Sequence, residues 1–213
     1  MNVLILTFIA ANVLISIQGF NNRAFFDKYK FNVGAVQSGQ KYRMFSAAFL
    51  HVDWMHLFFN MYALFLFGEV VEAAFGTLGF ILIYVVSLLS GNILSFLFHR
   101  KEPYYSAVGA SGAVSGILYA SVLVYPDMSL ILFPIPIPLP AYVFAIGYML
   151  YSIYGMKKQI GNIGHSAHIG GAFAGFLMAV VLWPSLLVQS PILSFVLIGS
   201  IVLFYIFRNR IFR

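Results

Sequence analysis

The chain has 213 residues, of which 62% are hydrophobic and only 8% are charged. A soluble domain carries roughly 25% charged residues, so this composition excludes a soluble protein and indicates one that crosses a membrane several times. There is no soluble segment to hold a nucleic-acid surface, and the net charge of +6 therefore favours binding to acidic lipid head groups. With no cysteine, the chain has no thiol nucleophile and no thiolate metal ligand.

Seven apolar runs are predicted to span the bilayer as helices, because each comes near the roughly 20 residues that a span needs. The first lacks the basic start and the small-residue cleavage site of a signal peptide, so we expect it to remain as a helix. The sequence thus predicts a single all-α membrane domain over residues 1–213. The runs are Val3–Ile17, Trp54–Phe67, Leu78–Phe98, Ala107–Tyr125, Leu139–Met156, Ile163–Trp183 and Ile192–Phe207.

The longest polar stretch, residues 19–53, follows the first run and is basic but also rich in aromatic residues. Four apolar residues recur in it at helical spacing, which predicts a short amphipathic helix lying in the membrane interface. We therefore expect this first loop to stay close to the bilayer. The four residues are Tyr42, Phe45, Phe49 and Leu50.

A serine between two glycines stands where a weakly polar loop turns into the fourth run, in Gly109-Ala110-Ser111-Gly112. The backbone N–H groups of a first helical turn have no intrahelical partner, and they favour negative charge. Such a position suits a nucleophile whose attack creates an oxyanion. The alternative is that Gly112 and Gly116, four residues apart, only allow another helix to approach closely.

The sixth run carries a second pair of glycines, Gly171 and Gly175, and His168 precedes this pair on the same helix face. We therefore expect the fourth and sixth runs to touch. Ser111 would then lie about 2.6–3.2 Å from His168, the geometry of a nucleophile and its general base. No aspartate is placed to form a triad, so the pattern indicates a dyad. The alternative for His168 is a hydrogen bond between helices.

His56 and Asn60 stand four residues apart near the start of the second run and share one helix face. Polar groups inside a membrane need partners and are functional candidates. They could stabilise an oxyanion, each contributing about 3–4 kcal/mol, or bind an anion, a metal or another helix. A metal needs three or four ligands, and no HExxH motif or carboxylate cluster joins these two, so we expect no metal.

These three signatures, in this order and on the second, fourth and sixth runs, resemble those of the rhomboid family of intramembrane serine proteases. The resemblance extends from about residue 19 to residue 183, with the third signature reading Ala167-His168-Ile169-Gly170-Gly171-xxx-Gly175. It implies a six-helix core with an extra helix at residues 191–207. The core would comprise a membrane-embedded first loop at residues 19–53 and a remainder at residues 54–183.

The resemblance also implies a role for each matching residue. Ser111 would be the nucleophile and His168 the general base, with the Ser111 N–H, His56 and Asn60 donating to the oxyanion. It also implies that Gly109 lies by the nucleophile and that Arg43 is a structural residue of the first loop. We further expect Gly112 to line the substrate site with Gly109. The spacing of the small residues predicts that Gly116, Gly171 and Gly175 hold the helices together.

By the same resemblance, the substrates would be single-span membrane proteins, cut at or near the membrane surface after a small residue in a segment with weak helical structure. No cofactor is implied, and the expected location is a bacterial plasma membrane. A catalytically silent relative that binds and escorts membrane helices is the main alternative. A small transporter is another, but no repeat between the two halves of the chain supports it.

The chain departs from the family pattern at Ser115, four residues after the nucleophile, where the family often has an aromatic residue near the catalytic histidine. The support for His168 must then come from elsewhere in the chain. Tyr119 and Phe173 are the residues that we expect to supply it.

The distribution of charge conflicts with the resemblance. Alternating the loops between the two sides puts all twelve Lys and Arg residues on the side where Ser111 and His168 open. The positive-inside rule makes that side cytoplasmic, whereas the resemblance places it outside the cytoplasm. An embedded first loop could hold its basic residues for structural reasons, so we follow the resemblance.

Overall fold

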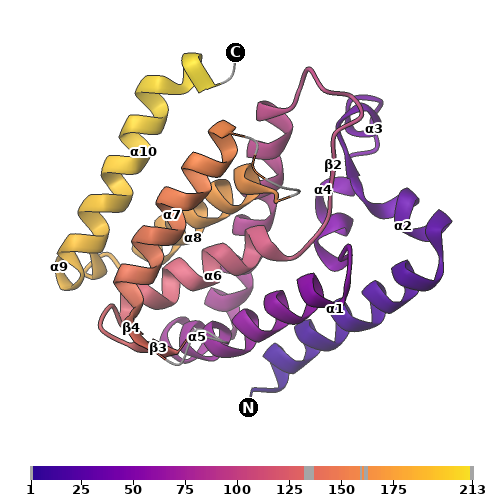
Figure 1. Ribbon diagram of the computed structural model, residues 1–213. Coiled ribbons are helices and arrows are strands. Elements are labelled where there is room, and N and C mark those ends of the chain that lie inside the picture. Colours follow the sequence, from indigo (N-terminus) through magenta and orange to yellow (C-terminus); the bar gives the residue numbers. More distant parts are fainter. Residues whose placement is uncertain (1, 132–136, 159, 161–162, 212–213) are drawn as a thin grey trace.

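The computed structural model describes residues 2–131, 137–158, 160 and 163–211. Over these residues the chain is an all-α membrane fold with two short antiparallel strand pairs, β1–β2 and β3–β4 (Figure 1). The strands are β1 (Phe31–Asn32), β2 (Ser106–Ala107), β3 (Ser129–Ile131) and β4 (Pro138–Pro140). The helices are α1 (Val3–Asn21), α2 (Arg23–Tyr29), α3 (Val33–Gln37), α4 (Arg43–Ser46), the 3₁₀ turn η1 (Ala47–Phe49), α5 (Trp54–Phe98), α6 (Ser111–Val124), α7 (Ala141–Lys158), α8 (His165–Leu182), α9 (Leu186–Gln189) and α10 (Pro191–Ile211).

Each of the seven predicted runs corresponds to a helical segment, and α5 contains two of them. Gly76 interrupts α5 with φ 69° and ψ 174°, a backbone conformation that favours glycine. Beyond this turn the chain runs back along itself, since a Cβ on Gly68 would lie 3.5 Å from the ring of Phe80. Of the described helices, α1, α5 and α8 are long and apolar enough to cross a membrane. That all seven runs cross it stays a prediction.

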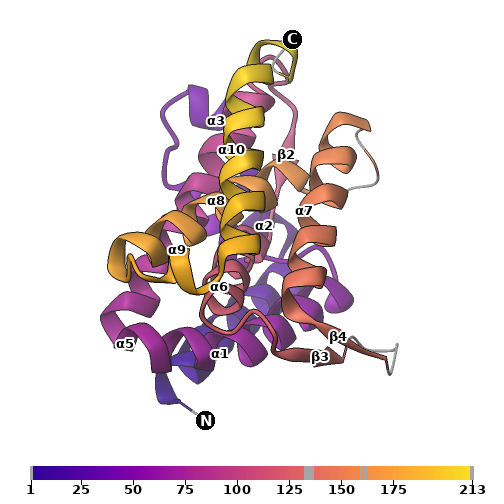
Figure 2. The same cartoon turned by 90° about the vertical axis from the view of Figure 1, so that its left-hand side faces the viewer.

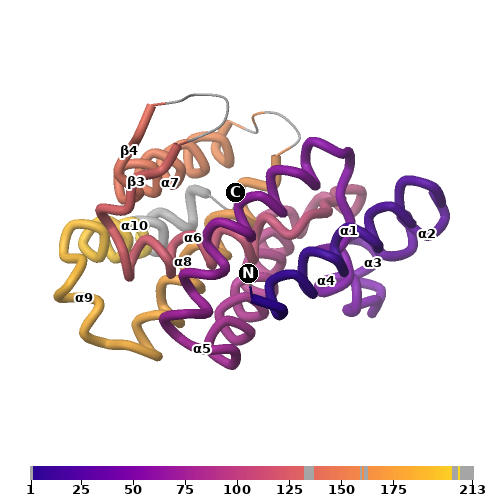
Figure 3. Tube along the Cα trace, turned by 90° about the horizontal axis from the view of Figure 1, so that it is seen from below, coloured from indigo at the N-terminus to yellow at the C-terminus, as the bar shows by residue number. Residues whose placement is uncertain are grey.

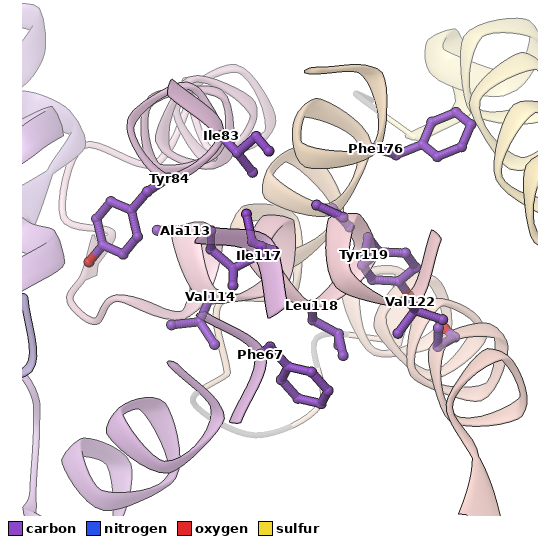
Figure 4. Close-up of a cluster of buried hydrophobic side chains, with 14 of the residues drawn as sticks. Phe67, Ile83, Tyr84, Ala113, Val114, Ile117, Leu118, Tyr119, Val122 and Phe176 are labelled. Carbon is purple, nitrogen blue, oxygen red and sulfur yellow. Dashed lines mark hydrogen bonds between the residues drawn. The ribbon is translucent and has the colours of Figure 1, made fainter. Parts of the chain in front are cut away.

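Helix α6 is the centre of the fold. Every residue from Gly112 to Leu123 is buried, as expected for a helix that is apolar on all sides. Viewed from below, α6 and α8 lie near the middle, with α1 and α2 at one side and α9 at the other (Figure 3). The apolar core surrounds α6, and its side chains pack among Ile83 and Tyr84 of α5 and Phe176 of α8 (Figure 4).

Glycines form the contact between α6 and α8. A Cβ on Gly171 would collide with the backbone of Gly112, and a Cβ on Gly175 would collide with the backbone of Gly116. The two helices therefore touch through main-chain atoms, which only glycine permits. The predicted contact between the fourth and sixth runs is confirmed.

The first loop folds into α2, β1, α3, α4 and η1. Within it, the Arg43 guanidinium donates to the carbonyl oxygens of Asp27 at 2.7 Å and Lys30 at 2.9 Å. These two bonds tie α4 to the end of α2. The predicted amphipathic helix corresponds to α4 and η1, where Tyr42 and Phe45 are exposed. Leu50 does not share that exposed face, because the backbone has become extended there and the side chain is fully buried.

Seen from the side in Figure 2, helix α10 lies at the front of the molecule, with α7 beside it to the right. The buried residues Leu193 and Leu197 join α10 to the core. At the start of α10, the Ser190 hydroxyl donates to the carbonyl oxygen of Leu123, 2.7 Å away. The β3–β4 hairpin extends from the start of α7. One side of α7, with Phe144 and Tyr148, lines a cavity.

Candidate active site

Ser111 is the first residue of α6, and the loop before it is held from two directions. Gly109 has φ 124°, a conformation that favours glycine, and the ring of His56 occupies the space that a Cβ would need. The Gly109 N–H donates to the carbonyl oxygen of Ala47 in η1, 3.0 Å away. These contacts fix the start of α6, where the Ser111 N–H belongs to the unpaired first turn.

The β1–β2 pair supplies the second support for this loop. Phe31 pairs with Ala107, and Asn32 pairs with Ser106, so the first loop forms a small sheet with the segment that precedes the serine. The Val33 N–H adds a bond to the carbonyl oxygen of Tyr105 at 3.1 Å. The sequence analysis missed this pairing, because two-residue strands leave no periodic signal.

His51 is a further residue that the sequence analysis did not select. Its side chain is fully buried, and its Nε2 accepts a bond from the Ala110 N–H at 3.5 Å. Nδ1 therefore carries the proton and donates to the Ser16 Oγ at 2.8 Å. The Ser16 hydroxyl in turn donates to the carbonyl oxygen of Phe49. Burial, and then the neighbouring His56, lower the pKa of His51 to about 3.

A cavity of about 1660 Å³ brings the predicted site residues together. The Asn60 amide donates to the carbonyl oxygen of His56, 2.9 Å away, and the imidazole of His56 covers Gly109. Ser111 of α6 and His168 of α8 both line this cavity, and no hydrogen bond joins these two described side chains. Catalytic hydrogen bonds are often long in the absence of substrate. The predicted residues that line the cavity are His56, Asn60, Gly109, Ser111, Gly112 and His168.

The ring of His168 lies against Tyr148 of α7. The two ring centroids are 5.6 Å apart, and the planes are inclined by 30°. The hydroxyl of Tyr148 lies 3.2 Å from the Oγ of Ser115 on α6. Tyr119, which the sequence analysis expected near His168, instead donates to the carbonyl oxygen of Ala145 at 2.6 Å. The structure thus gives His168 an aromatic neighbour that the sequence analysis did not select.

The cavity has further walls beyond the predicted residues. They include Arg23 and Lys30 of the first loop. They also include the apolar residues Leu66 of α5, Ile131 of β3 and Phe144 of α7. Among the described residues, no group of three His, Asp or Glu side chains is arranged to hold a metal ion.

The fold and the cavity together define a class of protein. The chain is a polytopic helical membrane protein in which a serine at a helix start and a histidine on a glycine-packed neighbour line one cavity. It matches the Rhomboid domain over residues 38–185, more than half of its length. The chain therefore belongs to the rhomboid family.

Curated relatives come from bacteria and from organelles. The chain is 35% identical over 151 residues to the rhomboid protease GluP of Bacillus subtilis, covering 69% of this chain and 27% of GluP. It is 26% identical over 188 residues to the mitochondrial RHOMBOID-like protein 12 of Arabidopsis thaliana, covering 81% and 54% of the two chains. It is 29% identical over 140 residues to the mitochondrial rhomboid protein 1 of Saccharomyces cerevisiae, covering 64% and 40%. The chain spans about half or less of the length of these relatives.

Proposed function

We propose that this protein is an intramembrane serine endopeptidase that cleaves transmembrane proteins at or near the membrane surface through Ser111 and His168. One observation carries the proposal: the serine at the start of buried helix α6 and the histidine on glycine-packed helix α8 line the same cavity. The similarity to a relative named as a rhomboid protease supports the same activity.

In the proposed reaction, the Oγ of Ser111 attacks the carbonyl carbon of the scissile peptide while His168 takes the hydroxyl proton. The carbonyl oxygen becomes an oxyanion that accepts from the Ser111 N–H and from His56 and Asn60. One amide hydrogen of Asn60 already bonds the His56 carbonyl oxygen, which leaves the second for this role. Each such donor stabilises the transition state by about 3–4 kcal/mol.

The oxyanion then collapses, and His168 returns the proton to the departing amine. The peptide carbonyl is now esterified to Ser111. Water, deprotonated by His168, attacks this ester and releases the new carboxyl end. The proton taken by His168 goes back to the Oγ of Ser111, so the cycle needs no cofactor and no metal.

The substrates that we propose are single-span membrane proteins. The cavity that Ser111 lines is also lined by apolar side chains of α5, β3 and α7, including Leu66, Ile131 and Phe144. Such a lining suits an apolar segment, and we propose a small residue before the cleaved bond, as the family resemblance implies. The scissile segment must leave its helix, because helical backbone amides are already hydrogen-bonded to each other.

The protein is a multi-pass membrane protein, and its similarity to mitochondrial and bacterial relatives leaves more than one possible membrane. We propose the plasma membrane of a bacterium, on the identity of 35% to the Bacillus subtilis protein.

Cleavage of a single-span reporter in liposomes tests the proposed activity. We expect Ser111→Ala and His168→Ala each to lower the cleavage rate on the order of 10³-fold or more, because nucleophile and base act as a unit. Ser121→Ala is the matched control. Its hydroxyl lies on the same helix but bonds the carbonyl oxygen of Leu118, so this variant should cleave at the wild-type rate.

Thermal unfolding in detergent should show all three variants to be folded. A folded wild type that binds the reporter without cutting it would overturn the proposal in favour of the escort role. Continued cleavage by Ser111→Ala would mean that another group is the nucleophile.

A further inference from the structure

The proposed base, His168, contacts a tyrosine of α7. This helix is not part of the glycine contact between α6 and α8, which we call the glycine seam. Tyr148 of α7 contacts His168 of α8 at 5.6 Å between ring centroids, and its hydroxyl reaches Ser115 of α6 at 3.2 Å. One tyrosine therefore joins three helices at the proposed site. Aromatic and imidazole rings at this separation attract each other in tilted or offset geometries.

Ser115 makes room for this tyrosine. It stands one turn after Ser111 on α6, so both side chains lie on one helix face. Ser115 is 2% exposed, and both it and Tyr148 line the cavity. An aromatic side chain at position 115 would occupy the space that the end of Tyr148 fills. A serine leaves that space open and offers a hydroxyl as hydrogen-bond partner.

Further ring contacts hold α7 against His168. Phe144, one turn before Tyr148, stacks on it at 5.9 Å with an angle of 10°. His165, one turn before His168, packs edge-on against Tyr151 of α7 at 5.2 Å and against His168 at 6.1 Å. Rings from α7 thus approach the base both directly and through His165.

We propose that Tyr148 is the positioning residue of His168, with Ser115 fixing the hydroxyl of Tyr148. The proposal rests on the proposed function and deepens it. The ring of Tyr148 limits the rotation of the imidazole, so that its basic nitrogen faces Ser111. Because Tyr148 comes from α7, which lines the apolar part of the cavity, the orientation of the base depends on where α7 lies.

Kinetics with a cleavable reporter separate this role from a structural one. We expect Tyr148→Leu to lower kcat on the order of 10- to 100-fold, with KM changed by less than about twofold, because the base is misplaced while the cavity stays open. Tyr148→Phe keeps the ring and should retain kcat within a few fold. Tyr154→Leu is the matched control, since Tyr154 is an exposed tyrosine on the same helix.

A double variant that places an aromatic ring on α6 instead of α7 tests whether the lost activity can be restored. Ser115→Phe combined with Tyr148→Leu returns an aromatic ring to the vicinity of His168 from α6, and it should recover kcat relative to Tyr148→Leu alone. Thermal unfolding in detergent shows which variants are folded. Wild-type kcat in folded Tyr148→Leu would overturn the proposal and leave the proposed protease activity intact.

A second measurement does not depend on cleavage. In protein labelled with ¹³C at histidine Cε1, the signal absent from His168→Ala belongs to His168. We expect Tyr148→Leu to shift this signal by removing the ring current, and Tyr148→Phe to leave it nearly in place. If the chemical shift of the His168 signal is the same in Tyr148→Leu as in the wild type, the two rings are not in contact and the proposal is wrong. This result does not depend on whether the protein cleaves any reporter.

Discussion

A single imidazole, that of His51, joins three segments that lie far apart in the chain. It bonds Ser16 of α1 and the Ala110 N–H just before the proposed nucleophile, and Ser16 extends the chain of bonds to η1. A neutral ring is required for this arrangement, because Nε2 must accept while Nδ1 donates. Protonation of His51 would break the bond to Ala110 and leave a buried charge.

The stability of the fold should therefore depend on pH through His51. Its pKa is lowered from 6.5 to about 3, first by burial and then by His56. The unfolded chain takes up this proton near pH 6.5 and the folded chain does not, so the stabilisation is complete above about pH 6.5. It is lost as the pH falls toward 3, by at most about 1.4 kcal/mol per pH unit.

Thermal midpoints in detergent between pH 7.5 and pH 4.5 check this dependence. His51→Gln keeps a donor and an acceptor but cannot titrate, so its midpoint should fall less on acidification than that of the wild type. Both proteins retain the other histidines, so the contribution of those residues to the pH dependence cancels when the two midpoints are compared. Equal slopes would show that His51 is not the group responsible.

Single residues of the candidate site could be predicted where the signal lies in neighbouring residues of the sequence. They could not be predicted where it depends on how two helices pack. Ser111 could be selected because its flanking glycines and the change to an apolar run are adjacent in the sequence. Tyr148 could not be selected, because its contact with His168 depends on the rotation of α7 relative to α8. Nothing in the neighbouring residues of α7 sets that rotation.

At the scale of whole helices, the glycine seam holds α6 against α8 through main-chain contacts. It was predictable because pairs four residues apart on each helix mark a close-packing face. The β1–β2 pairing was not, because Phe31 and Ala107 come from loops separated by the whole of α5 and neither strand exceeds two residues. The turn at Gly76 was predictable in position, since it falls between two apolar runs.

Adding one methyl group to the seam should destabilise the fold. In Gly175→Ala the new Cβ would collide with the Cα and carbonyl group of Gly116, and overpacking of this kind costs about 1–3 kcal/mol. Gly147→Ala is the matched control, because no atom lies within 4 Å of its added Cβ. Alanine's better helix propensity should make that variant as stable as the wild type or up to about 1 kcal/mol more stable.

Thermal unfolding of both variants in the same detergent provides the measurement. A lower midpoint is expected for Gly175→Ala alone. A midpoint of Gly175→Ala equal to that of Gly147→Ala would mean that the two helices can separate without loss, and the seam would not then position the proposed dyad.

At the scale of the whole molecule, the helix order separates two faces. If every predicted run crosses the bilayer, the loop before α6, with Tyr104, lies on the face where Ser111 opens, and helix α9, with Val188, lies on the opposite face. Both side chains are highly exposed, at 94% and 82%. Since the chain has no cysteine, a single introduced thiol at either position reports one face without background.

Labelling of intact cells with a membrane-impermeant maleimide resolves the conflict between charge and family resemblance. We expect Tyr104→Cys to be labelled from outside and Val188→Cys only after permeabilisation. The opposite pattern would mean that the positive-inside rule prevails and that the proposed site opens to the cytoplasm.

The short length of α6 has a consequence for where the proposed hydrolysis would take place. Its 14 residues extend about 21 Å, compared with about 30 Å for the hydrocarbon layer. If α6 runs along the bilayer normal and its last residue, Val124, lies at the far surface, Ser111 would lie roughly 9 Å below the near one. For the proposed hydrolysis, water would then have to fill a well inside the bilayer, and lipid chains would have to be kept out of it. A thicker membrane would deepen this well and make both the peptide and the water harder to deliver.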